Sequence, residues 1–194
     1  MAGWRRRALA IRPALRFGSG MPRLLISSYA AIADTVRRHK PSHMLTLMDD
    51  HVETPPAIHP ERHFRIRVND IVEPAEGAIA PAANHIEDVL TFARTWTREA
   101  PFLVHCWAGI SRSTAAAFIV LCDIRGPGHE AAIARELRAH APHAQPNTLM
   151  IRHADRILGR EGRMIAAVEA MGEARIVWDA EVVEMKLLAD EFHV

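Results

Sequence analysis

Short apolar runs alternate with amphipathic segments along the middle of the chain. Four of the runs are too short for helices, which predicts strands over residues 23–26, 43–48, 63–68 and 101–106. The intervening and following segments keep helical spacing, which predicts helices over residues 29–39, 81–98, 113–124, 130–140 and 147–158. Strands that alternate with helices form a sheet covered on both faces. We therefore expect an α/β fold with a central mixed, mostly parallel sheet of four to five strands flanked by helices.

The first 20 residues differ from the rest of the chain. They contain five arginines and no acidic residue, and they lack the continuous apolar stretch of a secretory signal. We interpret residues 1–20 as a flexible leader or as the product of a start codon placed too early, since a better patterned stretch begins at Met21. The chain then divides into a domain over residues 21–160 and a C-terminal extension over residues 161–194, which either packs on the domain or is flexible. Four apolar residues of the extension suit a strand or a longer helix: Ile176, Val177, Val182 and Val183.

Composition and charge narrow the classes of function. A chain of 194 residues that is 49% hydrophobic can bury one sizeable core, which excludes a disordered tail. A formal net charge of +1 provides no global attraction to nucleic acid or to an anionic membrane, so we expect neither partner. Two cysteines cannot form a disulfide framework, and no run of about 18 apolar residues is present to cross a bilayer. We expect a cytoplasmic protein; its oligomeric state is left open.

The end of the fourth predicted strand carries the candidate chemistry. The sequence there is HCWAGISRS, in which His105 and Cys106 end the strand and Arg112 and Ser113 open a helix. A loop of this length can turn its backbone N–H groups inward and form, with the helix N-terminus, a nest for a tetrahedral oxyanion. The planar guanidinium of Arg112 can bind two oxygens of that anion. Because the same nest stabilises a thiolate, we expect Cys106 to be a nucleophile and Ser113 to assist its release.

The loop residues themselves are candidate substrate-binding residues through their backbone. Gly109 permits a positive φ angle and a close approach to the anion. The full set of candidate substrate-binding residues is Trp107, Ala108, Gly109, Ile110, Ser111 and Arg112.

These residues match the signature H-C-x-x-x-x-x-R-[ST], and roughly residues 22–160 resemble the cysteine-dependent protein tyrosine phosphatases, in particular the small dual-specificity-like bacterial members. The resemblance implies hydrolysis of phosphate monoesters through a phosphocysteine intermediate, without metal or other cofactor. It implies that His105 fixes the loop through its ring hydrogen bonds and that Trp107 projects from the nest and lines the mouth of the pocket. The implied substrate is a phosphorylated protein, and a small phosphorylated metabolite or lipid is the alternative. The loop contains no lysine, whereas lipid-specific members tend to carry lysines there.

The resemblance also implies a general acid on a separate loop upstream of the cysteine. Asp70 follows the third predicted strand, 36 residues before Cys106, in a loop without regular periodicity. Asp49 and Asp50, at the end of the second predicted strand, are the alternatives for this role. Asn147 resembles the asparagine of a Pro-Asn pair that braces the loop in small dual-specificity phosphatases, although helix N-capping explains it equally well.

Two other function classes stay open. A sulfur transferase of the rhodanese type also uses a cysteine loop, but such loops are usually one residue shorter, and Ser113 argues against that class. A phospho-binding module without catalysis would keep Cys106 and Arg112 and lack the general acid.

The remaining cysteine and the histidines are given structural interpretations. Cys122 lies among apolar helix residues and is expected to be a small buried side chain rather than a redox partner. Five histidines lie mostly on predicted loops and strands, and no predicted helix places two of them on one face at the i, i+4 spacing of metal ligands. We interpret them as solvated surface side chains and expect no metal site: His39, His43, His51, His59 and His63.

Overall fold

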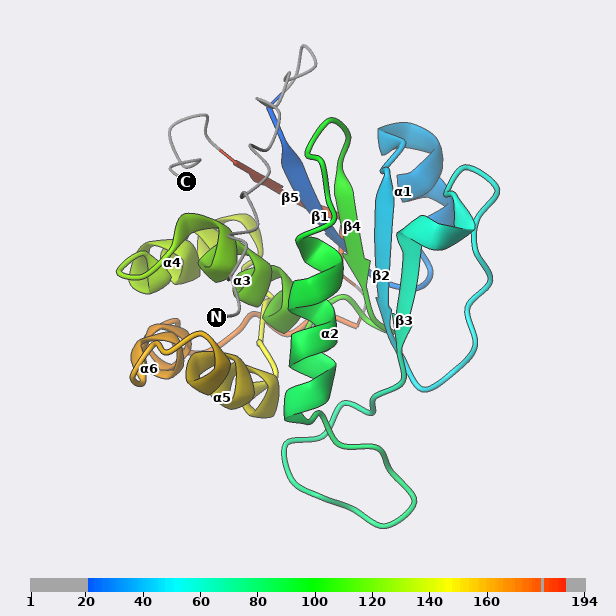
Figure 1. Cartoon of the computed structure of the whole chain (residues 1–194). Coiled ribbons are helices and arrows are strands. Elements are labelled where there is room, and N and C mark those ends of the chain that lie inside the picture. Colours follow the sequence, from blue (N-terminus) through cyan, green and yellow to red (C-terminus); the bar gives the residue numbers. More distant parts are fainter. Residues whose placement is uncertain (1–20, 179, 188–194) are drawn as a thin grey trace, which may run out of the picture.

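The computed structural model describes residues 21–178 and 180–187. Its centre is a five-stranded sheet with the strand order β3-β2-β4-β1-β5 (Figure 1). The strands are β1 (Arg23–Ser27), β2 (His43–Leu47), β3 (His63–Ile66), β4 (Phe102–His105) and β5 (Val183–Lys186). The first four are parallel, and β5 pairs with β1 in the antiparallel direction. The predicted α/β fold with a mixed, mostly parallel sheet is confirmed.

Helices cover both faces of the sheet. They are α1 (Ile32–His39), α2 (Ala83–Ala93), α3 (Arg112–Arg125), α4 (Glu130–His140), α5 (Thr148–Ile157) and α6 (Arg163–Glu169), with a short 3-10 turn at Pro60–Arg62. Because side chains alternate along a strand, Leu24 and Ile26 enter the larger apolar cluster under α2–α6, whereas Leu25 enters a smaller cluster with α1. The larger cluster makes one face of the sheet the main core.

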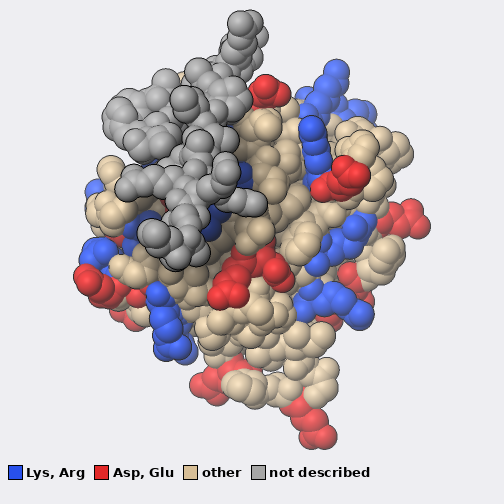
Figure 2. All heavy atoms as spheres, viewed as in Figure 1, with Lys and Arg blue, Asp and Glu red and all other residues tan. Residues whose placement is uncertain are grey.

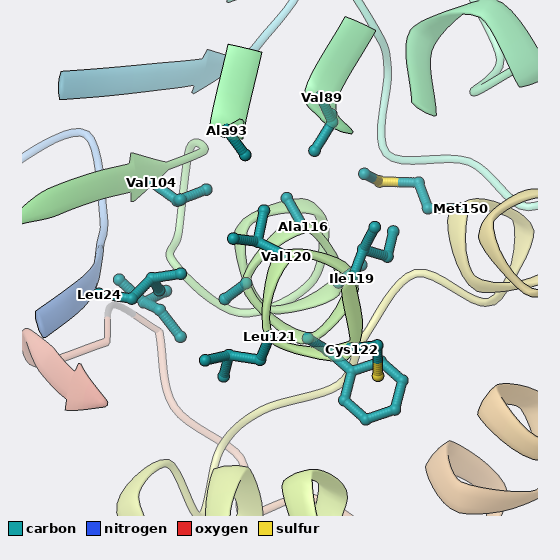
Figure 3. Close-up of a cluster of buried hydrophobic side chains, with 14 of the residues drawn as sticks. Leu24, Val89, Ala93, Val104, Ala116, Ile119, Val120, Leu121, Cys122 and Met150 are labelled. Atoms are coloured by element: carbon teal, nitrogen blue, oxygen red, sulfur yellow. The ribbon is translucent and has the colours of Figure 1, made fainter. Parts of the chain in front are cut away.

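Helix α3 is the centre of that core. Figure 3 shows α3 surrounded by Leu24 and Val104 from the sheet, by α2 and by Met150 of α5. Its residues from Arg112 to Cys122 are buried, so a helix without an exposed polar stripe is stable here. Each fully buried aliphatic or aromatic side chain contributes about 1.5–3 kcal/mol. This packing fixes the N-terminal end of α3 against the carboxyl end of β4.

Two predicted element boundaries are wrong. The helix expected over residues 29–39 begins only at Ile32, after Ala31; the side chains of Ser27 and Ser28 before it are buried, and their hydroxyls lack a hydrogen-bond partner within the described part of the chain. The chain must first pass beneath the loop after β4, which delays the helix. The helix expected over residues 81–98 ends at Ala93, because Trp96 turns into the core and its Nε1 donates to the carbonyl of Ala100 at 2.7 Å.

Two of the five histidines interpreted as solvated are buried, which corrects that prediction. His43, which opens the inner strand β2, is 3% exposed, and His63, which opens the edge strand β3 and bonds to Thr46 and Thr54, is 5% exposed. The His43 ring packs against the rings of Phe92 and Phe102. Among the described residues, no group of three or more His, Cys, Asp or Glu side chains is arranged to hold a metal ion.

The C-terminal residues contribute to the domain. α6 contacts α4 and α5, and β5 extends the sheet beyond β1. The basic leader over residues 1–20 lies outside the described residues. No helix among the described residues has both the length and the apolar character needed to cross a membrane.

The buried histidines predict acid destabilisation. Burial, with a smaller contribution from Arg62, lowers the pKa of His43 to about 4, and burial likewise lowers the pKa of His63 to about 3. Since the unfolded chain binds protons below about pH 6.5 and the folded protein does not, the free energy of unfolding falls as pH decreases from about 6.5 to 4. Urea unfolding at a series of pH values measures it. We expect His43→Leu to lose about 2 kcal/mol less than wild type over this range; an identical loss in both proteins contradicts the prediction.

Candidate active site

The loop between β4 and α3, residues 106–111, is here called the anion loop. Its carbonyl groups are held from outside by three other segments of the chain. The bonds are Tyr29 N to Trp107 O at 2.9 Å, Ala180 N to Ala108 O at 3.2 Å, Gln145 N to Ile110 O at 3.0 Å and Asn147 N to Ser111 O at 3.4 Å.

Because the carbonyl groups of the anion loop are bonded on its outer side, its N–H groups are directed to the opposite side. The backbone N–H groups of residues 107–112 donate to no group in the described part of the chain. The first turn of α3 adds further N–H groups that have no partner within the helix. Together these groups are a set of donors suited to a tetrahedral oxyanion.

Gly109 allows the anion loop to pack closely on the chain beneath it. Its φ is +76°, and a Cβ added there would lie 2.9 Å from the backbone nitrogen of Ser28. The same Cβ would lie 3.2 Å from the Cβ of Ala180. Both the backbone angle and the space therefore require glycine.

The Cys106 side chain lies at the base of the anion loop. The residue is 1% exposed, and its Sγ lies 3.2 Å from the Oγ of Ser113, in the first turn of α3. The hydroxyl can donate to the sulfur when the sulfur is a thiolate, because a hydroxyl rotates to suit its partner.

The guanidinium of Arg112 is held in place by one hydrogen bond and keeps a further N–H donor for a ligand. Its Nη1 donates to the carbonyl of Val68 at 2.7 Å, which anchors the side chain to the segment after β3. Its Nε is buried and has no hydrogen-bond partner among residues 21–178 and 180–187. A buried guanidinium donor without a partner is costly, and an oxyanion would satisfy it.

Asp70 is brought to the site, and the alternatives are placed differently. The Oδ1 of Asp70 accepts from Ser111 Oγ at 2.7 Å and from Asn147 Nδ2 at 2.9 Å, and its Oδ2 lies 3.7 Å from Arg112 Nε. Asp49 instead accepts from Asn69 Nδ2 at 2.9 Å, and Asp50 is exposed. Asn147 caps α5 by accepting from Met150 N and also donates from Nδ2 to Asp70, whereas its role as a brace of the anion loop stays a prediction.

His105 is fully buried behind the anion loop. Burial is the main cause that lowers its pKa to about 4; the hydrogen bond to Cys106 opposes this lowering, and the charge of Arg112 adds to it. The ring is therefore neutral at pH 7. Its Nδ1 lies 3.4 Å from Cys106 O and its Nε2 lies 2.6 Å from Thr46 Oγ1.

The rim of the site is aromatic on one side. Trp107 is 58% exposed and stacks on Tyr29 with ring centroids 5.6 Å apart. Cys122 lies in the core away from this rim, and burial raises the pKa of its thiol, which makes it an inert cysteine.

Sequence reasoning missed the groups that hold the anion loop from outside. Ala180, Gln145 and Tyr29 act through backbone N–H groups, and Val68 acts through its carbonyl. Backbone hydrogen bonds do not depend on the type of the side chain, so no sequence motif indicates them. The bond from Ser111 to Asp70 was accessible only once both loops were placed together.

Replacing Gly109 by alanine tests the close packing of the anion loop. Gly109→Ala forces a Cβ to within 3 Å of backbone atoms at a positive φ, so the loop must move outward. We expect a loss of about 1–3 kcal/mol in the free energy of unfolding and a weaker affinity for vanadate. Gly77→Ala is the matched control, because Gly77 also has a positive φ but its added Cβ meets open space. Equal affinity for vanadate in both variants would contradict the interpretation.

Comparison with known proteins gives two curated relatives and a set of similar folds. No family model matches the chain. Mouse dual specificity protein phosphatase 15 is 28% identical over 137 residues, which cover 67% of this chain and 54% of the relative. The rat protein of the same name matches equally well. The chain thus spans about half the length of the curated relatives that it matches, and a bacterial affiliation stays a prediction.

Solved structures share the fold. The crystal structure of DUSP15 aligns with a TM-score of 0.59 at 23% identity, covering 81% of this chain and all of that one. The Yvh1 phosphatase domain from Chaetomium thermophilum aligns with a TM-score of 0.53 at 21% identity, covering 76% of this chain and 97% of that domain. The chain is thus similar in sequence to curated dual specificity phosphatases, its HCWAGISRS loop matches the phosphatase signature, and it shares the fold of solved dual-specificity phosphatase structures.

Proposed function

We propose that this protein hydrolyses phosphate monoesters through a phosphocysteine intermediate, as a protein tyrosine or dual-specificity phosphatase. The observation that carries the proposal is a buried Arg112 Nε that has no hydrogen-bond partner among the described residues, in the same site as a buried thiol and a loop whose N–H groups donate to no group among those residues. Each feature suits a bound phosphate and its transfer to sulfur. The curated relatives are named as dual specificity phosphatases, which agrees with this chemistry.

In the first step the Cys106 thiolate attacks phosphorus. A sulfur–phosphorus bond forms, the bond from phosphorus to the ester oxygen breaks, and the leaving oxygen takes a proton from Asp70. Arg112 and the N–H groups of residues 107–112 bind the three non-bridging oxygens and stabilise the charge that they carry in the transition state. Neutral His105 does not transfer a proton; it holds the loop.

In the second step water attacks the phosphocysteine. Asp70, now ionised, takes a proton from the water while a new oxygen–phosphorus bond forms and the sulfur–phosphorus bond breaks. The departing Cys106 thiolate accepts a hydrogen bond from Ser113, 3.2 Å away. Inorganic phosphate leaves, and Asp70 is protonated again for the next cycle.

The proposed substrate is a phosphorylated protein, with a small phosphorylated metabolite or lipid as the alternative. The exposed Trp107 and Tyr29 rings offer an apolar surface beside the site that a polypeptide can contact. Lys, Arg, Asp and Glu side chains are interspersed on the face shown in Figure 2, which fits a locally recognised partner rather than nucleic acid. We propose a cytoplasmic location, because a thiolate nucleophile needs a reducing compartment.

Variants of the nucleophile and of the acid test the chemistry. Cys106→Ser is expected to abolish turnover of p-nitrophenyl phosphate, which in wild type resists EDTA. Asp70→Asn is expected to lower turnover of a phosphoserine peptide by about 10²–10⁴-fold, and that of p-nitrophenyl phosphate less, because p-nitrophenolate leaves without protonation. Asp50→Asn is the matched control and keeps wild-type rates. If Asp50→Asn loses activity and Asp70→Asn does not, the acid is assigned wrongly. A wild type that binds vanadate but turns over neither substrate indicates the phospho-binding module instead.

Ser113→Ala tests the second step separately. Without the hydroxyl, the thiolate leaves more slowly from phosphorus, whereas its attack in the first step is less affected. We expect rapid-mixing experiments with p-nitrophenyl phosphate to show a burst of p-nitrophenol followed by a slower steady state. Thr114→Val is a control on the same helical turn, since the Thr114 hydroxyl bonds to backbone carbonyls rather than to sulfur. A proportional fall of both phases in Ser113→Ala contradicts the assignment.

A further inference from the structure

A chain of side-chain hydrogen bonds runs across three strands on the α1 side of the sheet and ends at Cys106. Thr46 Oγ1 of β2 lies 2.6 Å from His105 Nε2 and 2.7 Å from His63 Nε2. The other ring nitrogen of His63 lies 3.0 Å from Thr54 Oγ1, which accepts a hydrogen bond from Arg65 Nη2. Strand register brings these groups together, since Thr46 is paired with His105 on one side and with Arg65 on the other.

The contact of His105 with Cys106 determines which atom donates and which accepts in the hydrogen bonds from His105 through Thr46 to His63. The partner of His105 Nδ1 is the carbonyl of Cys106, which can only accept, so Nδ1 carries the proton. A neutral His105 then accepts at Nε2, and the donor must be the Thr46 hydroxyl. Since that hydroxyl has one proton, its second contact requires that His63 donates from Nε2.

The Arg65 end is compatible with the same direction. A guanidinium only donates, so Thr54 Oγ1 accepts from Arg65, and its own proton is available for His63 Nδ1. A neutral His63 that accepts at Nδ1 carries its proton on Nε2, as the other end requires. Burial lowers the pKa of His63 to about 3, with smaller contributions from Arg65, His105 and His51, which supports the neutral ring.

We propose that His63 is a positioning residue for the nucleophile, acting through Thr46 to hold His105 in the tautomer that donates to the Cys106 carbonyl. This inference rests on the proposed function, because it concerns the same nucleophile. Without the Nε2–H of His63, the Thr46 hydroxyl is free to accept from His105 instead. His105 would then present a lone pair to the Cys106 carbonyl, and the anion loop would lose one of its inner supports.

The experiment measures the reactivity of Cys106 without any substrate. The rate of Cys106 alkylation by iodoacetate is followed against pH in the full chain and identified by peptide mass spectrometry. In His63→Leu, we expect the midpoint of the profile to rise by about 0.5–1 pH unit, so that alkylation below the midpoint slows by about 3–10-fold. His63→Gln keeps an amide donor in place of Nε2–H and is expected to restore the rate to within about twofold.

His43→Leu is the matched control. It removes another buried histidine from the same sheet, one that bonds to Ser42 and takes no part in the series of hydrogen bonds from His63 to Cys106. A purely structural effect of losing a buried ring would move both profiles alike. The proposal requires that only His63→Leu shifts the midpoint, and it is overturned if His43→Leu shifts it equally or if His63→Gln fails to restore it.

Two further measurements keep the test decisive. If His63→Leu does not fold, Thr54→Val removes the donor to His63 Nδ1 from a partly exposed position and is expected to shift the midpoint in the same direction. An unchanged pH profile of Cys106 alkylation in the variant that folds overturns this inference and leaves the proposed function in place. A wild-type Cys106 that reacts no faster than an ordinary thiol at pH 6 overturns the proposed function, whatever His63 does.

Discussion

The site depends on the outward hydrogen bonds of the anion loop. A loop that gathers N–H groups on one side must place its carbonyls on the other, and buried carbonyls need donors. Tyr29, Gln145, Asn147 and Ala180 supply those donors from three segments that are distant in sequence. The fold brings all three to the carboxyl end of β4, and Gly109 permits the close contact with one of them. Anion binding by the loop is therefore a property of the whole domain.

Electrostatics at the site follows from burial. The Arg112 guanidinium donates to Val68 O and lies beside the Asp70 carboxylate, so its positive charge is held in a fixed position at the anion loop. His105 and His63 lie close by, yet burial keeps both rings neutral and turns them into oriented hydrogen-bonding groups. A charged imidazolium behind the loop would alter the stabilisation of the thiolate whenever the pH changed. The neutral rings of His105 and His63 support the anion loop without adding a group that titrates near the pH at which the thiolate forms.

The sequence predicted β1 to β4, α1 to α5 and the identity of the loop, because apolar periodicity and a nine-residue motif are local signals, whereas α6 and β5 lie in the C-terminal extension that it left open. It missed the burial of His43 and His63, since their cover comes from residues distant in sequence: His43 packs on the rings of Phe92 and Phe102, and His63, although on the edge strand β3, bonds to Thr46 and Thr54. It also missed the role of Ala180, which acts through its backbone and only after β5 joins the sheet. Asp70 could be preferred over Asp49 and Asp50 by spacing, but its contact with Ser111 needed the folded arrangement of two loops.

The central claim is that phosphate passes through the sulfur of Cys106. Rapid acid quenching of the protein mixed with a phosphotyrosine peptide, followed by peptide mass spectrometry, tests it most directly. The account predicts the added mass of one phosphoryl group on the peptide that contains Cys106, and localises it to that residue. A phosphoryl group on His105, or turnover in a Cys106→Ser variant equal to that of wild type, would contradict the account.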